Sequence, residues 1–215
     1  MKSLKELFYE CAYVGNWQVA GEDTDYKFVE DKSTLYIYFK GSDSDYDWRQ
    51  NFSFGKRPYK DMSKPYRVHK GFLKEWKDVE DIIIDKIKDT KYKSIIIVGY
   101  SLGGAIAWFC HELCWFHRKD IRDNIFGFGF EAPRVYASWF ISKELQERWK
   151  NFLVIKNNND IVVSCPPLVF GYRHVSDMLH IEGDTSLVEG KLPKCIKSHY
   201  PQCVLDGLIK QEKDL

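Results

Sequence analysis

The sequence predicts an α/β fold in which a central, mostly parallel sheet is covered by helices on both faces. Apolar runs at residues 94–98 and 125–130 are short, nearly uninterrupted and followed by helix-like stretches. Apolar strands that alternate with helices are typical of parallel sheets buried on both sides. The chain has 215 residues, of which 44% are hydrophobic, so we expect a single domain spanning residues 1–215.

The first part of the chain predicts two helices, two strands and a long loop. Apolar residues at helical spacing indicate an amphipathic helix at the start: Leu4, Leu7, Phe8, Cys11 and Ala12. Residues 26–30 and 34–39 are strand-like. Residues 43–64 are polar and aromatic without a clear period, and we expect them to form the longest loop. A long helix is then predicted over residues 68–89.

The rest of the chain alternates between strand-like and helix-like segments. Strands are predicted at 94–98, 125–130, 152–156 and 173–181, and helices at 103–118, 137–150 and 201–210. In a parallel sheet of this kind, ligands and reactive groups gather at the C-terminal ends of the strands. The loops that follow the strands are therefore where we look for a site.

Charge and hydropathy exclude several classes of function. Lys and Arg number 32 against 31 Asp and Glu, so the net charge of +1 gives no electrostatic case for a nucleic acid partner. No stretch approaches the roughly 18 apolar residues that an integral membrane segment needs. The first 17 residues lack the apolar run of a signal peptide. We therefore expect a cytoplasmic protein. Export by a route that needs no leader peptide is the alternative.

The cysteines do not predict a metal site. The six cysteines form no CxxC pair, and we expect them to be small buried hydrophobic residues. Cys110, Cys114 and His117 share a predicted helix and are the one hint of a metal ligand set. A fourth ligand is not apparent, so we expect no metal and no cofactor.

A G-x-S-x-G motif is the main functional signal. Residues 98–104 are Val-Gly-Tyr-Ser-Leu-Gly-Gly, and Ser101 lies directly after a predicted strand and before a predicted helix. The pentapeptide arises by chance in many chains, but a sharp strand-to-helix turn holds a serine hydroxyl in a strained, exposed position. Ser101 is therefore the candidate nucleophile.

A serine nucleophile needs a histidine base, and the histidine needs a carboxylate that fixes its orientation. In this arrangement the chain order is serine, acid, histidine. Asp160 follows the strand at 152–156 by a short turn and is the candidate acid, although an Asp in a turn often binds only its own backbone. His199, in a polar stretch before the last helix, is the candidate base, and His174 is the alternative.

The negative charge that develops during acyl transfer needs an oxyanion hole with two positioned donors. The backbone N–H of Leu102, the residue after the serine, is expected to supply one. Ser42 comes directly after the strand at 34–39 and its Gly41, and it offers both an N–H and a hydroxyl. We therefore expect the oxyanion hole at Leu102 and Ser42.

Several blocks in this order resemble the class 3, fungal-type triacylglycerol lipases of the α/β-hydrolase fold: residues 38–42, 47–48, 68–72, 99–104, 132–135, 159–162, 166–167 and His199. The resemblance implies a triad of Ser101, Asp160 and His199, and it implies that His174 lies outside that triad. It departs at Lys40, where the family usually has arginine. The segment from Ser42 to about Gly55 corresponds to the family's lid but lacks an apolar face, which predicts weak activation at lipid interfaces.

Together these observations predict a serine carboxylic-ester hydrolase that passes through an acyl-enzyme. Its expected partner is a small acyl ester or lipid, with transient contact with a lipid surface, and the chain is expected to be a monomer. The alternative is a catalytically silent, lipase-like binding or signalling module. Acyl transfer to an alcohol other than water would use the same residues.

Overall fold

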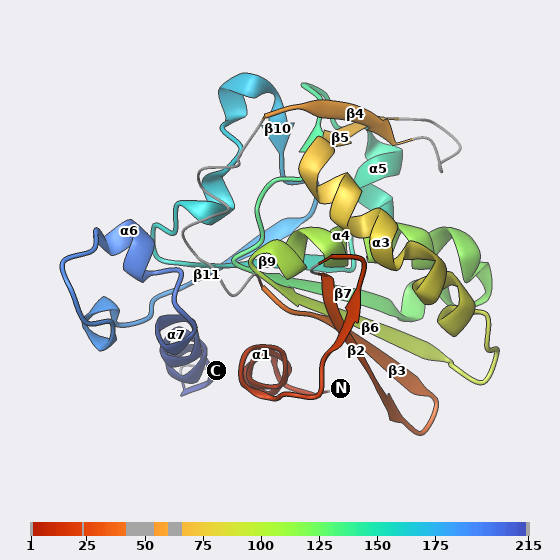
Figure 1. Ribbon diagram of the computed structural model, residues 1–215, viewed down its shortest axis with the longest axis horizontal. Helices are drawn as coiled ribbons and strands as arrows, with labels where there is room; N and C mark the ends of the chain where they lie inside the picture. Colours follow the sequence, from red (N-terminus) through yellow and green to blue (C-terminus); the bar gives the residue numbers. More distant parts are fainter. Residues whose placement is uncertain (1, 23, 42–53, 60–65, 214–215) are drawn as a thin grey trace.

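A computed structural model describes residues 2–22, 24–41, 54–59 and 66–213 of the chain. Its central sheet has seven strands in the order β1-β2-β3-β6-β7-β9-β11 (Figure 1). The first three strands are antiparallel, and the pairs from β3 to β11 are parallel. These strands are β1 (Gln18–Ala20), β2 (Thr24–Asp31), β3 (Thr34–Phe39), β6 (Ser94–Tyr100), β7 (Ile125–Phe130), β9 (Phe152–Asn157) and β11 (Asp177–Ile181).

Helices cover both faces of this sheet, as predicted. The helices α3 (Lys70–Ile87) and α4 (Leu102–His117) lie on one face, and α1 (Leu4–Tyr13) and α7 (Pro201–Lys213) lie on the other (Figure 1). The side chains of β3 alternate between the two hydrophobic clusters because neighbouring residues of a strand point in opposite directions. Leu35, Ile37 and Phe39 pack with the α3 and α4 cluster, whereas Tyr36 and Tyr38 pack with the α1 and α7 cluster.

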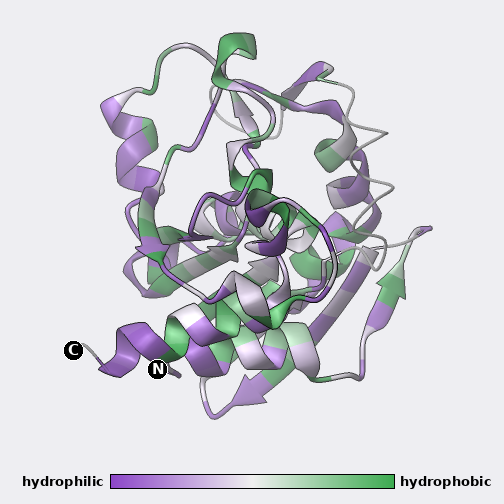
Figure 2. Cartoon of the chain, turned by 90° about the vertical axis from the view of Figure 1, so that its left-hand side faces the viewer, coloured by the Kyte–Doolittle hydropathy of each residue, from purple (hydrophilic) through white to green (hydrophobic). Residues whose placement is uncertain are grey.

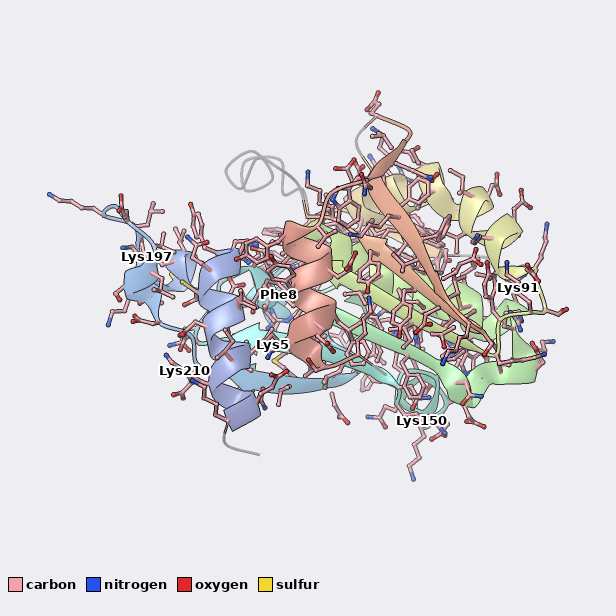
Figure 3. The ribbon with its side chains drawn as sticks, turned by 90° about the horizontal axis from the view of Figure 1, so that it is seen from below. Lys5, Phe8, Lys91, Lys150, Lys197 and Lys210 are labelled. Atoms are coloured by element: carbon pink, nitrogen blue, oxygen red, sulfur yellow. The ribbon has the colours of Figure 1, made fainter. Side chains whose placement is uncertain are left out.

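The helices α1 and α7 form one layer, and the last loop of the chain comes directly before α7. Figure 3 shows the two helices side by side, with Phe8 on α1 and Lys210 on α7. Phe8 is fully buried, and an exposed ion pair joins Lys5 to Glu212 at 2.6 Å. Polar and apolar residues both occur along α7 (Figure 2), as expected for a helix with one face on a sheet. α1 begins with a capping box in which Ser3 and Glu6 each bind the other's backbone N–H.

A second, smaller sheet was not predicted. It has the order β10-β8-β5-β4 and is antiparallel. Its strands are short: β4 (Lys56–Tyr59), β5 (Tyr66–His69), β8 (Tyr136–Ala137) and β10 (Tyr172–Arg173). The remaining short helices are η1 (Lys119–Asn124), α5 (Lys143–Arg148), η2 (Val162–Ser164), η3 (Leu168–Phe170), η4 (Thr185–Leu187) and α6 (Lys194–Lys197).

Three local predictions need correction, and the small sheet is the main cause. The helix predicted at 137–150 is wrong over its first half, because Tyr136 and Ala137 pair within the small sheet and α5 starts only after Ser142. The strand predicted at 173–181 is divided between β10 and β11. The loop predicted at 43–64 contains β4, while its residues 43–53 and 60–64 lie outside the described ranges.

A buried polar cluster lies within the layer of α4. Glu112 is fully buried, accepts a hydrogen bond from the Tyr66 hydroxyl at 3.2 Å and lies 3.4 Å from Arg148. Burial raises the pKa of Glu112 to about 8, and Arg148 and Tyr66 oppose this shift only in part. The cluster therefore places a titratable group in the core.

All six cysteines lie in described ranges, and all of them are free thiols. Cys110 and Cys114 are buried on α4 with their Sγ atoms 4.0 Å apart, whereas His117 is exposed. The three side chains that hinted at a metal therefore do not face a common space. Within the described part of the chain, no helix is both long and apolar enough to cross a bilayer.

Candidate active site

Ser101 occupies a sharp turn between β6 and α4. Its backbone has φ 56° and ψ −122°, a conformation that residues with a side chain rarely adopt. The turn brings backbone segments so close that only glycine fits at its flanks. A Cβ atom on Gly99 would lie 2.0 Å from the Gly103 carbonyl oxygen, and one on Gly103 would lie 2.2 Å from the Phe39 carbonyl oxygen. The packing thus explains the glycines of the motif and the strain at Ser101.

His199 lies against Ser101, in the short connection between α6 and α7. Its Nε2 atom is 2.8 Å from Ser101 Oγ, and its Nδ1 atom is 2.7 Å from Asp160 Oδ2. All three side chains are buried, with exposed fractions of 4%, 1% and 0% for Ser101, His199 and Asp160. An Nδ1–H bond to the carboxylate leaves Nε2 free to accept the serine proton. The structure therefore brings the three predicted residues into one hydrogen-bonded chain.

Asp160 is held as an anion by its contacts. Its Oδ1 atom accepts the Val162 N–H at 2.9 Å, while Oδ2 faces His199. Burial opposes ionisation, but the histidine and the other hydrogen bonds outweigh it, so the pKa of Asp160 is lowered. The Asp160 N–H also donates to the Asn157 carbonyl at 3.1 Å. Asp160 is therefore both part of a turn and a partner of His199.

Two further residues hold the backbone around His199. The Asn157 side chain, at the end of β9, donates to the Ser198 carbonyl at 2.8 Å and accepts the Gly183 N–H at 2.7 Å. The Tyr100 hydroxyl donates to the His199 carbonyl, and the two rings stack with centroids 5.3 Å apart. Tyr100 precedes the serine, so the turn and the base are tied to each other directly. Neither residue was predicted, because only the folded chain brings them to residues 198 and 199.

The expected oxyanion donors can be placed in part. Leu102 is the first residue of α4, so its N–H is one of the amides that has no partner within the helix. Ser42 lies outside the described residues. The residue before it, Gly41, is close to the turn, because a Cβ atom on it would lie 3.2 Å from Ser101 Cβ. The chain thus leaves β3 beside Ser101.

The alternative base, His174, does not join this group. Its Nε2 atom is 2.8 Å from the Val163 carbonyl, and burial lowers its pKa to about 4. His69 caps the start of α3, where its Nδ1 accepts the Phe72 N–H at 3.3 Å. His111 is buried beside Arg148, whose carbonyl is 3.1 Å from its Nε2 atom. These three histidines bind backbone atoms and support the fold.

Glu131 is a residue of the site that sequence reasoning missed. It follows β7 directly and is fully buried, and one of its carboxyl oxygens lies within 4.8 Å of a carboxyl oxygen of Asp160. Its position at the C-terminal end of a predicted parallel strand was an available signal. Within the described ranges, Glu131, Asp160 and His199 are also the one group close enough to hold a metal, with candidate ligand atoms within 4.8 Å of one another. Both ring nitrogens of His199 already have partners, an arrangement that suits proton transfer with the serine.

Curated proteins similar to this chain are fungal lipases. A lipase from Rhizomucor miehei is 30% identical over 158 residues, which cover 69% of this chain and 42% of the relative. A secreted mono- and diacylglycerol lipase from Fusarium solani is 30% identical over 161 residues, covering 71% of this chain and 45% of the relative. The chain therefore spans less than half the length of these relatives.

The expected cytoplasmic location is contradicted by these comparisons. The Fusarium solani relative is named a secreted lipase, and further relatives are named in the same way. The expectation depended on the composition of the first 17 residues alone. That stretch is a poor guide where the matched relatives are more than twice as long as the aligned region.

The fold and the family agree with each other. A solved triacylglycerol lipase, whose catalytic centre is described as a serine protease triad, superposes with a TM-score of 0.66 at 26% identity. The match covers 80% of this chain and 67% of that one. The α/β-hydrolase fold with a mostly parallel sheet is thereby confirmed. The family model for class 3 lipases matches residues 36–170, which is more than half of the sequence. The chain therefore belongs to the class 3 lipase family.

Proposed function

We propose that this protein is a serine carboxylic-ester hydrolase in which Ser101 is the nucleophile, His199 the base and Asp160 the acid. The observation that carries the proposal is the continuous chain of short contacts, 2.8 Å from Ser101 Oγ to His199 and 2.7 Å from His199 to Asp160. Its burial supports the proposal further, because electrostatic interactions strengthen where water is excluded.

The proposed reaction has two halves. Ser101 Oγ attacks the ester carbonyl carbon while His199 Nε2 takes the hydroxyl proton, and Asp160 stabilises the resulting imidazolium. The Leu102 N–H and Ser42 stabilise the oxyanion, and His199 then gives its proton to the departing alcohol. In the second half, water gives a proton to His199 and attacks the acyl-serine. The carboxylic acid leaves and Ser101 recovers its proton.

We propose acylglycerols and simpler acyl esters as the substrate class, with transient contact with lipid surfaces. The names of the relatives support this class, and they also support action outside the cell. Hydrolysis of p-nitrophenyl esters of increasing chain length, followed by mono-, di- and triacylglycerols, would define the preference. Assay of culture medium against washed cells would test the location.

We also propose that residues 1–215 act as one domain and as a monomer. Both hydrophobic clusters pack on the same seven-stranded sheet, and all the proposed reactive groups come from one chain. A single unfolding transition in calorimetry and a mass near 25.4 kDa in light scattering are the expected results. Two transitions, or twice that mass, would contradict these proposals.

A fluorophosphonate probe tests the proposed nucleophile most directly. It should label the wild-type protein, and Ser101→Ala should abolish labelling and lower kcat by about 10⁶-fold. Ser94→Ala is the matched control, because Ser94 starts the same strand at its opposite end. This variant should be labelled as strongly as the wild-type protein. If folded wild-type protein is neither labelled nor active, the enzyme proposal is wrong and the silent binding module takes its place.

A further inference from the structure

Glu131 has a backbone conformation that is unfavourable for a residue with a long side chain. Its φ of 52° lies in the left-handed region, where residues with a branched or long side chain are strained. The residue is held there by its N–H, which donates to the Ile155 carbonyl at 2.8 Å, and its side chain is fully buried. A strained, buried acid next to the reacting groups indicates that its side chain has a use there.

The contacts of the Glu131 carboxyl group require a proton. Its Oε1 atom accepts the Asn157 N–H at 2.7 Å. Its Oε2 atom is buried and meets no N–H or hydroxyl donor in the described part of the chain. One of its carboxyl oxygens nevertheless lies within 4.8 Å of a carboxyl oxygen of Asp160. Two buried carboxyl groups this close are stable together, and can share a hydrogen bond, only if one of them carries a hydrogen, because two anions in contact repel each other.

The contacts of Glu131 and Asp160 decide which of the two carboxyl groups carries the proton. Asp160 accepts from His199 Nδ1 and from the Val162 N–H, and both bonds favour its anion. Among the described residues, the Asn157 N–H is the donor to Glu131, and the charge of Lys156 opposes the rise in its pKa only in part. Burial, followed by the hydrogen bond and the charge of Asp160, raises the pKa of Glu131 well above its usual range, whereas that of Asp160 is lowered.

We propose that Glu131 stays protonated at neutral pH and donates a hydrogen bond to Asp160, as a positioning residue for the pair formed by Asp160 and His199. The proposal rests on the proposed function of that pair. The donated hydrogen bond fixes the rotation of the Asp160 carboxylate and draws part of its charge away from His199. Less charge on Asp160 makes the imidazolium form of His199 less favourable.

Infrared spectroscopy tests the proton without requiring activity. At neutral pH the infrared spectrum of the wild-type protein minus that of Glu131→Gln should contain the C=O stretching band of a buried, protonated carboxyl group. The band of buried Glu112, whose pKa is about 8, is common to both spectra and cancels in the difference. A difference spectrum without a carboxyl band would overturn the proposal. Because this readout needs no turnover, it distinguishes a wrong role for Glu131 from a protein that is not an esterase.

Two variants of nearly equal size then test the role. Gln can accept the Asn157 N–H and donate to Asp160, as a protonated Glu does, whereas Met can do neither. Glu131→Met should lower kcat by about tenfold and move the acid limb of kcat/KM, where His199 takes up a proton, to higher pH. Glu131→Gln should restore both toward the wild-type values.

The direction in which the acid limb of the kcat/KM profile moves distinguishes a protonated Glu131 from an anionic one. If Glu131 were an anion, Glu131→Gln would delete a negative charge beside His199 and move the limb to lower pH by about one unit or more. That result, or equal behaviour of the Gln and Met variants, would overturn the proposal. Unchanged circular dichroism and melting temperature in both variants would show that the comparison concerns folded protein.

Discussion

Replacing Asp160 by Asn tests how the acid orients the base. Asp160 Oδ1 accepts the Val162 N–H at 2.9 Å, and Oδ2 accepts His199 Nδ1–H at 2.7 Å. An Asn side chain keeps the bond to Val162 only with its carbonyl oxygen, so its NH₂ group must face His199. The imidazole then has to accept at Nδ1 and carry its hydrogen on Nε2, which lies 2.8 Å from Ser101 Oγ. In that tautomer Nε2 cannot take the serine proton.

The expected loss follows from this tautomer change. In a serine protease, the same substitution leaves the geometry intact and lowers kcat about 10⁴-fold, which corresponds to about 5.5 kcal/mol of activation free energy. We expect a loss of this order here in the hydrolysis of a p-nitrophenyl ester, with a parallel loss in the rate of fluorophosphonate labelling. The thermal stability should change little, because both hydrogen-bonding positions remain occupied.

The matched control is Asp177→Asn, which removes the same charge from an exposed position at the start of β11. It should leave kcat and labelling unchanged. A loss smaller than about tenfold in correctly folded Asp160→Asn protein would refute the reasoning, because Asp160 would then not determine the tautomer of His199.

Three other predictions concern the turn, the core and the lid. Gly103→Ala should lower the stability by about 3 kcal/mol or prevent folding, since its Cβ would meet the Phe39 carbonyl at 2.2 Å, whereas Gly15→Ala, with no atom within 4 Å, should be neutral in thermal melts. Between pH 4.5 and about 8, folded Glu112 holds a proton that the unfolded chain has released, so stability should fall as pH rises through this window. In denaturant titrations, Glu112→Gln should remove roughly 2 to 4 kcal/mol of the stability lost across this window, and an unchanged loss would contradict the role of Glu112. The polar residues 43–50 predict that the hydrolysis rate rises smoothly through the micellar concentration of a short-chain ester, and a sharp jump would contradict a polar cover.

Local patterns predict β6, β7 and β9 well because each of these parallel strands is a short, mainly apolar run. Residues 125–130 form a strand with the predicted bounds, and the helix predicted at 103–118 differs from α4 by one residue at each end. The order of Ser101, Asp160 and His199 follows from the serine, acid, histidine order of this arrangement, and the positions of Ser101 and Asp160 follow from the rule that reactive groups come after strands. Their assigned roles remain predictions, although their side chains lie in hydrogen-bond contact.

What the sequence could not predict depends on contacts between distant residues. The two-residue strand β8 exists because Tyr136 pairs with Val68, and no periodic pattern is visible in so short a segment. The available signal for Glu131, an acid at the end of a predicted strand, does not separate it from other acids in such positions. Its importance appears only when the fold places it against Asp160, 29 residues later in the chain. Ser42 and its neighbours up to residue 53 lie outside the described residues.

The cysteines have a practical consequence for how this protein reaches its native state. None of the six cysteines is cross-linked, and Cys11, Cys110, Cys114 and Cys203 are shielded in the interior. The folded chain is therefore held together by its packing, and its folding does not wait for an oxidant or a disulfide isomerase. Active enzyme should be obtainable from the reducing cytosol of an ordinary bacterial expression host, without refolding, and dithiothreitol should leave its melting temperature unchanged.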